Sequence, residues 1–252
     1  MFTPVYVGRF VVCLVALGFG SVQDLSTREV SNWVWVVSVP ICLFLDGLDM
    51  YLGIIPVSTF LVSLGVSLLV GLGLFYLGFF GGADAKALLL IAAAFPSYVY
   101  MPGLFLARVL FLPLVLVFFT ATVLSALYPL SILLLNLSDL GRGRHLLQGI
   151  EVRHWFGKLI LYATVRKVSL ERLHKSLKYL PAEKVVLQDG KPVRRPVYFV
   201  GAEADVDGLL KELEAQGELF NEGILASPTI PMVVFLTVGF VSANVVAVLS
   251  FV

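Results

Sequence analysis

Charged residues are almost confined to one stretch of this 252-residue chain. Of 18 basic and 17 acidic residues, residues 1–137 contain only four and five, and all the others fall between Asp139 and Glu222. From Thr229 to the end the chain has no charge at all. A soluble core of this size cannot bury such long apolar segments. We therefore predict an α-helical polytopic membrane protein, with a soluble insert before its last helix.

Composition excludes several classes of protein. The chain is 59% hydrophobic and 14% charged, against about 25% charged in a typical soluble domain. The net charge of +1 argues against a nucleic-acid-binding protein, which would carry a basic excess. Cys13 and Cys42 both lie in apolar runs and do not make a zinc site, which needs about four ligands. We expect no metal and no other cofactor.

The apolar segments predict about six transmembrane helices, since a span needs about 20 mostly apolar residues. The fourth segment is short, so we expect it to cross incompletely or to lie among the others. No A-x-A-like cleavage site follows the first segment, so we expect it to be retained as a span. The predicted segments are Val5–Val22, Asn32–Leu45, Ile54–Phe80, Ala85–Phe95, Gly103–Tyr128 and Thr229–Val252. The predicted domains are a membrane body (1–137), a soluble insert (138–228) and a final helix (229–252).

Basic residues alternate from loop to loop. The first, third and fifth loops contain Arg28, Lys86 and Arg142, whereas the second and fourth contain no Lys or Arg. Basic loops favour the cytoplasmic side. This pattern predicts a multi-pass protein of the plasma membrane with these loops and the insert in the cytoplasm.

Four charges lie toward the opposite side. We expect Arg9 and Arg108 to reach the outer lipid headgroups along their aliphatic stems. Asp46 and Asp49 are expected to be solvated charges in the second loop.

Two aspartates are candidates for chemistry. Asp24 lies where the first span ends, and Asp84 lies where the third ends and the fourth begins, so both are predicted on the cytoplasmic face. Two close carboxylates share one proton, so one can activate water while the other protonates a peptide carbonyl. Each also has a structural alternative: Asp84 is a good helix cap, and Asp24 could simply end its helix and hold the turn.

The residues before Asp84 are small. Gly81, Gly82 and Ala83 allow another backbone to approach closely. Gly78 and Gly82 have the four-residue spacing that permits close helix contact. Lys86 is expected to be an interfacial, positive-inside residue.

Two sequence blocks resemble a known family. The run Gly81-Gly82-Ala83-Asp84 resembles the Gly-x-Gly-Asp motif of membrane aspartyl proteases, with the small residue Ala83 in place of the second glycine. The block from Asp24 to Trp33, which includes Arg28 and Asn32, resembles the other conserved block of type IV prepilin peptidases. The spacing is most similar to that of the archaeal preflagellin (prearchaellin) and prepilin peptidases.

The resemblance implies an aspartic endopeptidase with Asp24 and Asp84 as its catalytic pair. Arg28, Asn32, Gly81, Gly82, Ala83 and Lys86 would then be supporting motif residues. The implied substrates are prearchaellin or prepilin-like precursors, which would lose a short leader at the cytoplasmic face. The bacterial branch adds a Cys-x-x-Cys zinc region and methyltransferase activity. This chain has no Cys-x-x-Cys, so neither is expected.

Two other classes of function stay open. One is a non-catalytic polytopic membrane protein, such as a transporter-like protein or a scaffold for pilus or archaellum assembly. There the two aspartates would be caps or an ion site. The other is a presenilin-like intramembrane protease, which is disfavoured because Gln23, rather than Tyr, precedes Asp24 at a helix end.

The insert is predicted to be a small α+β domain. Its predicted order is strand, helix, two strands, helix, strand, which suggests a ferredoxin-like topology, as the resemblance also implies. Asp189-Gly190 is a strong hairpin-turn signal. Arg142, Arg144 and Arg153 could contact anionic lipid headgroups, although solvated surface charge is the commoner role. The predicted elements are Lys158–Val165, Ser169–Leu180, Lys184–Gln188, Val193–Val200, Asp205–Gln216 and Leu219–Leu225.

Overall fold

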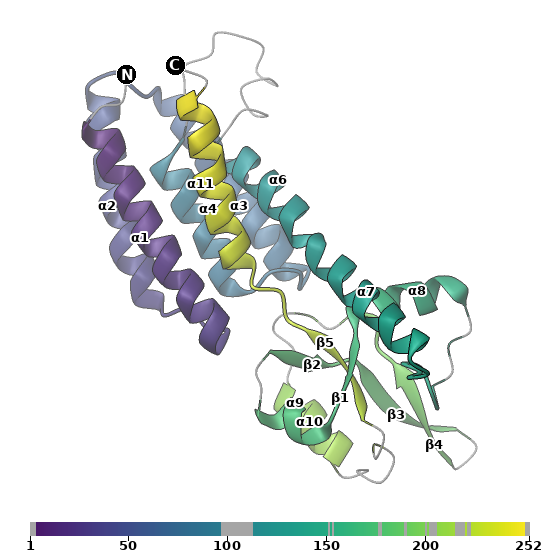
Figure 1. Cartoon of the computed structure of the whole chain (residues 1–252). Helices are drawn as coiled ribbons and strands as arrows, with labels where there is room; N and C mark the ends of the chain where they lie inside the picture. The colour runs from purple at the N-terminus through teal and green to yellow at the C-terminus, as the bar shows by residue number, and fades with distance from the viewer. Residues whose placement is uncertain are drawn as a thin grey trace. The chain divides into compact units, whose positions relative to one another are not determined.

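The chain forms two compact units in a computed structural model (Figure 1). The membrane unit contains Met1–Ser125 and Pro231–Val252, and the insert unit contains Ala126–Ile230. The structure describes residues 4–96, 113–150, 152, 154–175, 178–188, 191–199, 201, 206–214, 220 and 223–249.

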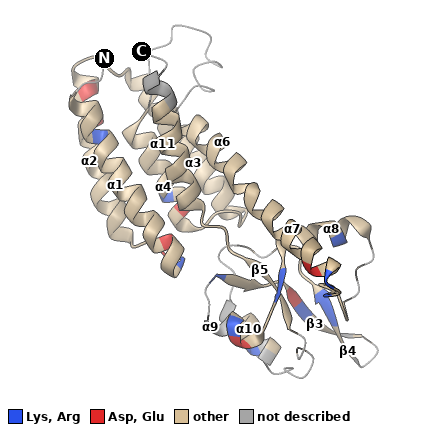
Figure 2. Ribbon diagram, viewed as in Figure 1, with Lys and Arg blue, Asp and Glu red and all other residues tan. Residues whose placement is uncertain are grey.

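Six helices make up the described part of the membrane unit: α1 (Pro4–Thr27), α2 (Asn32–Tyr51), α3 (Val57–Tyr76), α4 (Gly82–Ala94), α6 (Pro113–Ser125) and α11 (Met232–Leu249). The short helix α4 is central, because it contacts each of the other five. Its side chains from Leu90 to Ala94 are fully buried. The prediction of a short fourth helix lying among the others is confirmed. Charges are sparse on this unit, as Figure 2 shows.

Among the described residues, four segments are long and apolar enough to span a membrane: Pro4–Thr27, Asn32–Tyr51, Val57–Tyr76 and Pro113–Gly141. A shorter apolar helix covers Met232–Val245. Residues 103–112 of the predicted fifth span, which include Arg108, lie outside the described residues. The chain is therefore a polytopic helical membrane protein, and a total of about six spans stays a prediction.

The junction between α3 and α4 differs from the sequence prediction. Gly78 lies in a turn with φ +75°, a left-handed conformation that favours glycine, and Gly82 begins α4. The prediction that these two glycines form a helix-contact pair is therefore wrong. The close contact uses Gly71 of α3 instead, where an added Cβ would lie 3.5 Å from Ala85.

The charges toward the other end of α1 are buried. Arg9 Nη1 donates to Asp46 Oδ1, and Arg9 Nη2 donates to Asp49 Oδ2 at 2.5 Å. The predictions of solvated loop aspartates and of Arg9 reaching the headgroups are wrong, because α2 continues to Tyr51 and both aspartates lie inside it. The spacing of three residues puts Asp46 and Asp49 on one helix face, where a single arginine from α1 pairs with both.

Breaking this cluster should destabilise the membrane unit. Arg9→Met leaves two buried carboxylates without their cation, which costs about 3–5 kcal/mol in comparable buried pairs. We expect a clear drop in the thermal unfolding midpoint of the purified protein in detergent. Neutralising the aspartates as well, in Arg9→Met with Asp46→Asn and Asp49→Asn, should restore most of the loss. Equal unfolding midpoints for Arg9→Met and the unmodified chain would contradict a stabilising role for the cluster.

The insert unit combines helices with two small sheets. Strand β5 lies between β1 and β2 and is antiparallel to both, and β3 and β4 form a separate hairpin. Buried Glu183 of β3 forms a two-pronged ion pair with Arg194 of β4 and accepts the backbone N–H of Leu225 in β5 at 2.8 Å. The elements are α7 (Leu127–Gly141), α8 (Trp155–Thr164), β1 (Arg166–Val168), α9 (Leu170–Lys175), β2 (Tyr179–Pro181), β3 (Glu183–Gln188), β4 (Lys191–Pro196), α10 (Val206–Glu214) and β5 (Ile224–Pro228).

The sequence predicted this unit in part. The hairpin is confirmed by the pairing of Gln188 with Lys191, although the turn at residues 189–190 lies outside the described residues. The predicted strand Lys158–Val165 is wrong, because most of it belongs to α8. Asn136 of α7 holds the end of α8 by donating to the carbonyls of Tyr162 and Val165 at 2.8 and 2.7 Å. The described strands do not form the single four-stranded sheet of a ferredoxin-like fold.

Candidate functional site

Asp24 lies in the last turn of α1, and only 9% of its surface is exposed. Its Oδ1 lies 3.9 Å from Nη1 of Arg28, four residues further along the chain. The backbone of Val233, in the first turn of α11, hydrogen-bonds the carboxylate. Asp24 Oδ2 is buried without a hydrogen-bond partner among the described residues. The carboxylate is therefore enclosed but only partly satisfied.

Asp84 lies in the first turn of α4. Its Oδ2 accepts the backbone N–H of Gly81 at 3.0 Å, which satisfies a free amide just before the helix. The expected capping role of Asp84 is therefore present. The amide dipoles at this end of α4 also favour a negative charge.

The fold brings the two aspartates to the same end of the helical bundle. Asp24 comes from the C-terminal end of α1 and Asp84 from the N-terminal end of α4, and these two helices pack together. The carboxyl groups lie close enough to repel each other electrostatically. Two like charges in a poorly hydrated site favour sharing a proton.

Arg28 has an unusual backbone. Its φ is +60°, in the left-handed region that costs a non-glycine residue about 1–2 kcal/mol. Its Nε and Nη1 are buried without hydrogen-bond partners among the described residues. Orphaned buried polar atoms are rare in proteins and call for an unseen partner such as water or a ligand. Arg28 and Asp24 together thus present polar atoms that a bound molecule can satisfy.

The two sequence motifs also meet directly. Lys86 Nζ, from α4, donates to Asn32 Oδ1 at the start of α2 with a distance of 2.6 Å. This contact joins Lys86 to the motif that contains Asp24. The local sequence gave Lys86 an interfacial role and the family resemblance made it a supporting motif residue. Neither identified Asn32 as its partner, because nothing in local spacing relates residues so distant along the chain.

The small residues before Asp84 have space around them. A Cβ added at Gly81 would lie 3.7 Å from Asp84 Oδ2, and one added at Gly82 would lie 3.9 Å from Phe75. Both are ordinary contact distances, so none of the described backbone packs closely on these two glycines. Sequence reasoning also missed Val233, because it contributes through its backbone.

Among the described residues, no group of three or more His, Cys, Asp or Glu side chains could hold a metal ion. The chemical groups that converge at this end are two carboxylates, a guanidinium and an ammonium. Such a set is suited to proton transfer and to binding a polar peptide segment.

The contact between Lys86 and Asn32 should contribute to stability. We expect a coupling of about 1 kcal/mol in a double-mutant cycle of Asn32→Ala and Lys86→Met, since hydrogen bonds to charged groups are worth about 1.5–3 kcal/mol and this one is exposed to solvent. The measurement is thermal or denaturant unfolding of the four proteins in the same detergent. Strictly additive effects would show that the two side chains do not interact.

Two comparisons with known proteins cover the part of the chain that contains this site. Residues 11–130 match the model of the type IV leader peptidase family. The chain is also 30% identical over 138 residues to a preflagellin peptidase of Methanococcus voltae, in an alignment that covers 52% of this chain and 58% of that relative. The chain thus matches little more than half of the relative's length. The family match contains both aspartates and both sequence motifs. Through residues 11–130, this membrane protein is similar to the type IV leader peptidase family.

Proposed function

We propose that the chain is a membrane aspartic endopeptidase that removes the short leader from preflagellin (prearchaellin) or prepilin-like precursors. The observation that supports the proposal is the position of Asp24 and Asp84, from separate motifs, at the same end of the bundle. The matched relative is a preflagellin peptidase, and the family match contains both residues.

The proposed mechanism uses one proton shared between the two carboxyl groups. The ionised aspartate takes a proton from a water molecule, whose oxygen attacks the peptide carbonyl carbon. The neutral aspartate gives its proton to the carbonyl oxygen, so no full negative charge develops there. The C–N bond of the tetrahedral intermediate then breaks, and the aspartate that took the water proton donates it to the leaving nitrogen. The other aspartate takes back a hydroxyl proton as the new carbonyl forms, so a carboxylic acid is released and the pair again holds one proton.

The surrounding residues have distinct proposed roles. Gly81 holds one oxygen of Asp84 and so orients its carboxyl group. The backbone of Val233 does the same for Asp24. Arg28 supplies guanidinium N–H groups next to Asp24, where the backbone of an extended peptide can accept them. Each of these groups acts by positioning a reacting partner.

The location of the site suits a precursor with a polar leader and an apolar helix. The two aspartates lie at helix ends. The substrate backbone around the bond to be cut can therefore be extended there while the substrate's apolar helix stays in the membrane. The basic residues Arg28 and Lys86, near this end of the bundle, favour the cytoplasmic side for it. The leader would therefore be released into the cytoplasm.

Replacing either aspartate should abolish cleavage. Asp24→Asn and Asp84→Asn each remove a group that must exchange a proton, so we expect a loss of at least about 100-fold from the lost acid or base alone. The measurement is leader removal from a precursor, followed on a gel with membranes that contain each variant.

The matched control is Glu29→Gln, which neutralises an exposed carboxylate in the same loop as Arg28. It should cleave at the rate of the unmodified chain. Normal turnover by Asp24→Asn or Asp84→Asn, at equal amounts in the membrane, would remove that residue from the mechanism.

The reaction should not depend on a divalent metal, because the proposed mechanism activates water with a carboxylate. Cleavage should continue in excess EDTA at an unchanged rate. Serine- and cysteine-directed reagents should also have no effect. Inhibition by EDTA that added zinc reverses would contradict the two-carboxylate mechanism.

A further inference from the structure

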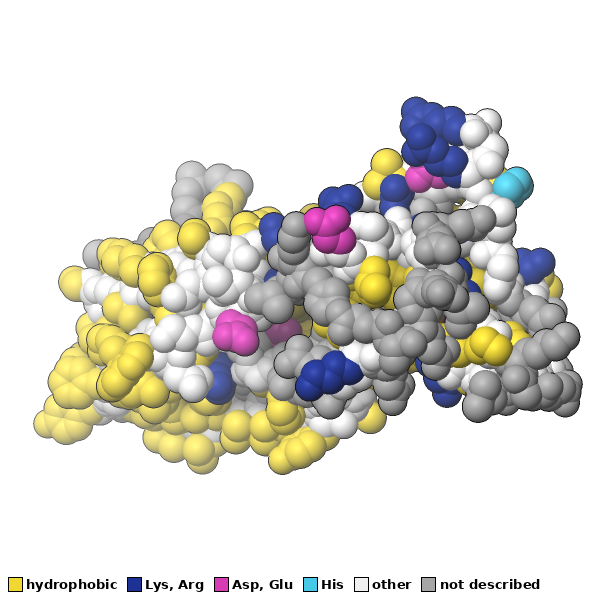
Figure 3. Space-filling model, turned by 90° about the horizontal axis from the view of Figure 1, so that it is seen from below, with side chains coloured by type: hydrophobic (Ala, Val, Ile, Leu, Met, Phe, Trp, Pro, Cys, Tyr) yellow, Lys and Arg dark blue, Asp and Glu magenta, His cyan; other side chains and the backbone are white. Residues whose placement is uncertain are grey.

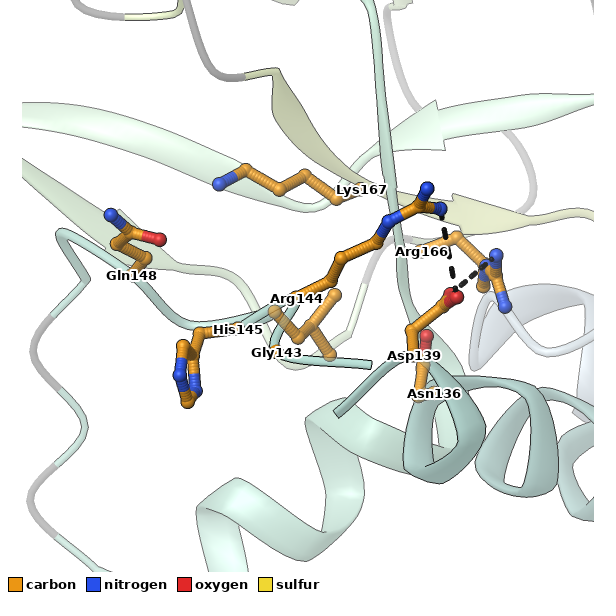
Figure 4. Close-up of a pocket in the computed structure, with 9 residues that line it drawn as sticks. Asn136, Asp139, Gly143, Arg144, His145, Gln148, Arg166 and Lys167 are labelled. Carbon is orange, nitrogen blue, oxygen red and sulfur yellow. Dashed lines mark ion pairs between the residues drawn. The ribbon is translucent and has the colours of Figure 1, made fainter. Parts of the chain in front are cut away.

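The insert unit contains a polar pocket at the C-terminal end of α7. Its volume is about 450 Å³, and Figure 4 shows the side chains around it. Seven of the lining residues can carry a charge or donate a hydrogen bond: Asn136, Asp139, Arg144, His145, Gln148, Arg166 and Lys167. The pocket lies within the insert unit and shares no residue with the site around Asp24 and Asp84.

The pocket has an excess of positive charge. Arg166 Nη2 lies 3.1 Å from Asp139 Oδ2, and Arg144 Nη1 lies 3.9 Å from Asp139 Oδ1. One carboxylate thus pairs with two guanidinium groups. Arg166 Nη1 is buried without a hydrogen-bond partner among the described residues. The charge of the two guanidinium groups exceeds that of Asp139, which favours binding of an anion.

The donor geometry favours a phosphate group. Arginine presents a planar fork of N–H groups that matches phosphate oxygens, and lysine adds a compact charge. Figure 4 shows His145, Gln148 and the ammonium of Lys167 away from Asp139, so donors are present on both sides of the pocket. Arg144 is 77% exposed and can turn toward a ligand without disturbing the interior.

The same unit exposes large apolar side chains. On α8, Trp155 and Phe156 are 76% and 58% exposed, and on α7, Leu130, Leu134 and Leu137 are each about half exposed. Exposed apolar groups of this size mark a contact with a partner or a membrane. Tryptophan in particular is enriched at the membrane–water interface.

The chain connections indicate that this partner is the bilayer. The insert unit begins within the apolar segment Pro113–Gly141, so α7 itself continues a candidate span. At its other end, the chain passes directly into α11. Since both ends of the unit lead into the membrane, its apolar side chains are within reach of lipid. Basic side chains gather on this unit, whereas hydrophobic side chains dominate the visible face of the membrane unit (Figure 3).

We propose that this pocket binds the phosphate headgroup of an anionic phospholipid, while the exposed apolar side chains of α7 and α8 contact the adjoining lipid. The proposal is independent of the peptidase activity. A soluble phosphate would use the same donors, but it would not account for the exposed Trp155 and Phe156. Residues Arg142 and Arg153, which the sequence also suggested for lipid contact, do not line the pocket, and Arg153 lies outside the described residues.

The experiment measures lipid binding by the purified full chain in neutral detergent, using native mass spectrometry. The probes are phosphatidylglycerol, phosphatidylcholine, and glycerol phosphate as a soluble anion. We expect phosphatidylglycerol to bind at least tenfold more tightly than either of the others. Arg144→Gln combined with Lys167→Gln should weaken that binding at least tenfold, because each basic residue near an anionic lipid surface contributes roughly fivefold to the affinity.

The matched control is Lys184→Gln combined with Arg195→Gln, which removes the same charge from the β3–β4 hairpin. It should change phosphatidylglycerol binding less than twofold. The single change Arg144→Gln, at a mostly exposed side chain, should weaken binding several-fold and keeps the test valid if the double variant does not fold. Trp155→Ala with Phe156→Ala should weaken lipid binding and leave binding of glycerol phosphate unchanged.

Three results would overturn the proposal. Equal losses in the pocket and hairpin variants would show that only net charge matters. Equal binding of phosphatidylglycerol and phosphatidylcholine would exclude headgroup recognition. Glycerol phosphate binding as tightly as phosphatidylglycerol would assign the pocket to a soluble phosphate instead of a lipid.

Discussion

The burial of α4 is the constraint on which the membrane unit depends. This helix is too short to cross a bilayer by itself and contacts the five other described helices of the membrane unit. Its interior half is made mostly of alanine and leucine, and small side chains allow neighbouring backbones to approach closely. Because lipid is as apolar as these side chains, packing rather than exclusion from water must hold the helix in place. The position of Asp84, in the first turn of α4, follows directly from that packing.

The charged residues at the two ends of α1 form different ion pairs. At one end, Arg9 pairs with both Asp46 and Asp49, and the buried cluster connects α1 to α2. At the other, Asp24 and Arg28 form a single, looser ion pair of 3.9 Å. Both ends contain buried polar atoms without hydrogen-bond partners among the described residues, so such atoms do not distinguish them. Burial alone therefore does not identify a functional aspartate in this protein.

The insert unit is a small polar domain that depends on a different buried interaction. Its two sheets are joined by buried Glu183, which pairs with Arg194 and also binds the backbone of β5. A buried ion pair with all of these hydrogen bonds fixes the hairpin at one place on the neighbouring sheet. The helices α7 and α8 leave apolar side chains exposed, and the basic pocket lies at the end of α7. Exposed apolar side chains on α7 and α8, together with a basic pocket at the end of α7, suit a domain that binds an anionic lipid surface.

The sequence by itself determined the membrane class, most helix positions, the β3–β4 hairpin and the two aspartates as candidates. These features follow from local signals: runs without charge, an Asp-Gly turn, and carboxylates at predicted helix ends. It did not determine that Asp46 and Asp49 pair with Arg9, since their burial depends on where α2 ends and on which helix faces it. It misassigned Lys158–Val165 as a strand, because the contact of Asn136 with the end of α8 overrides local β-propensity. The contacts of Asp24 with Val233 and of Lys86 with Asn32 were decided only by tertiary structure, because packing brings together residues that no local spacing relates.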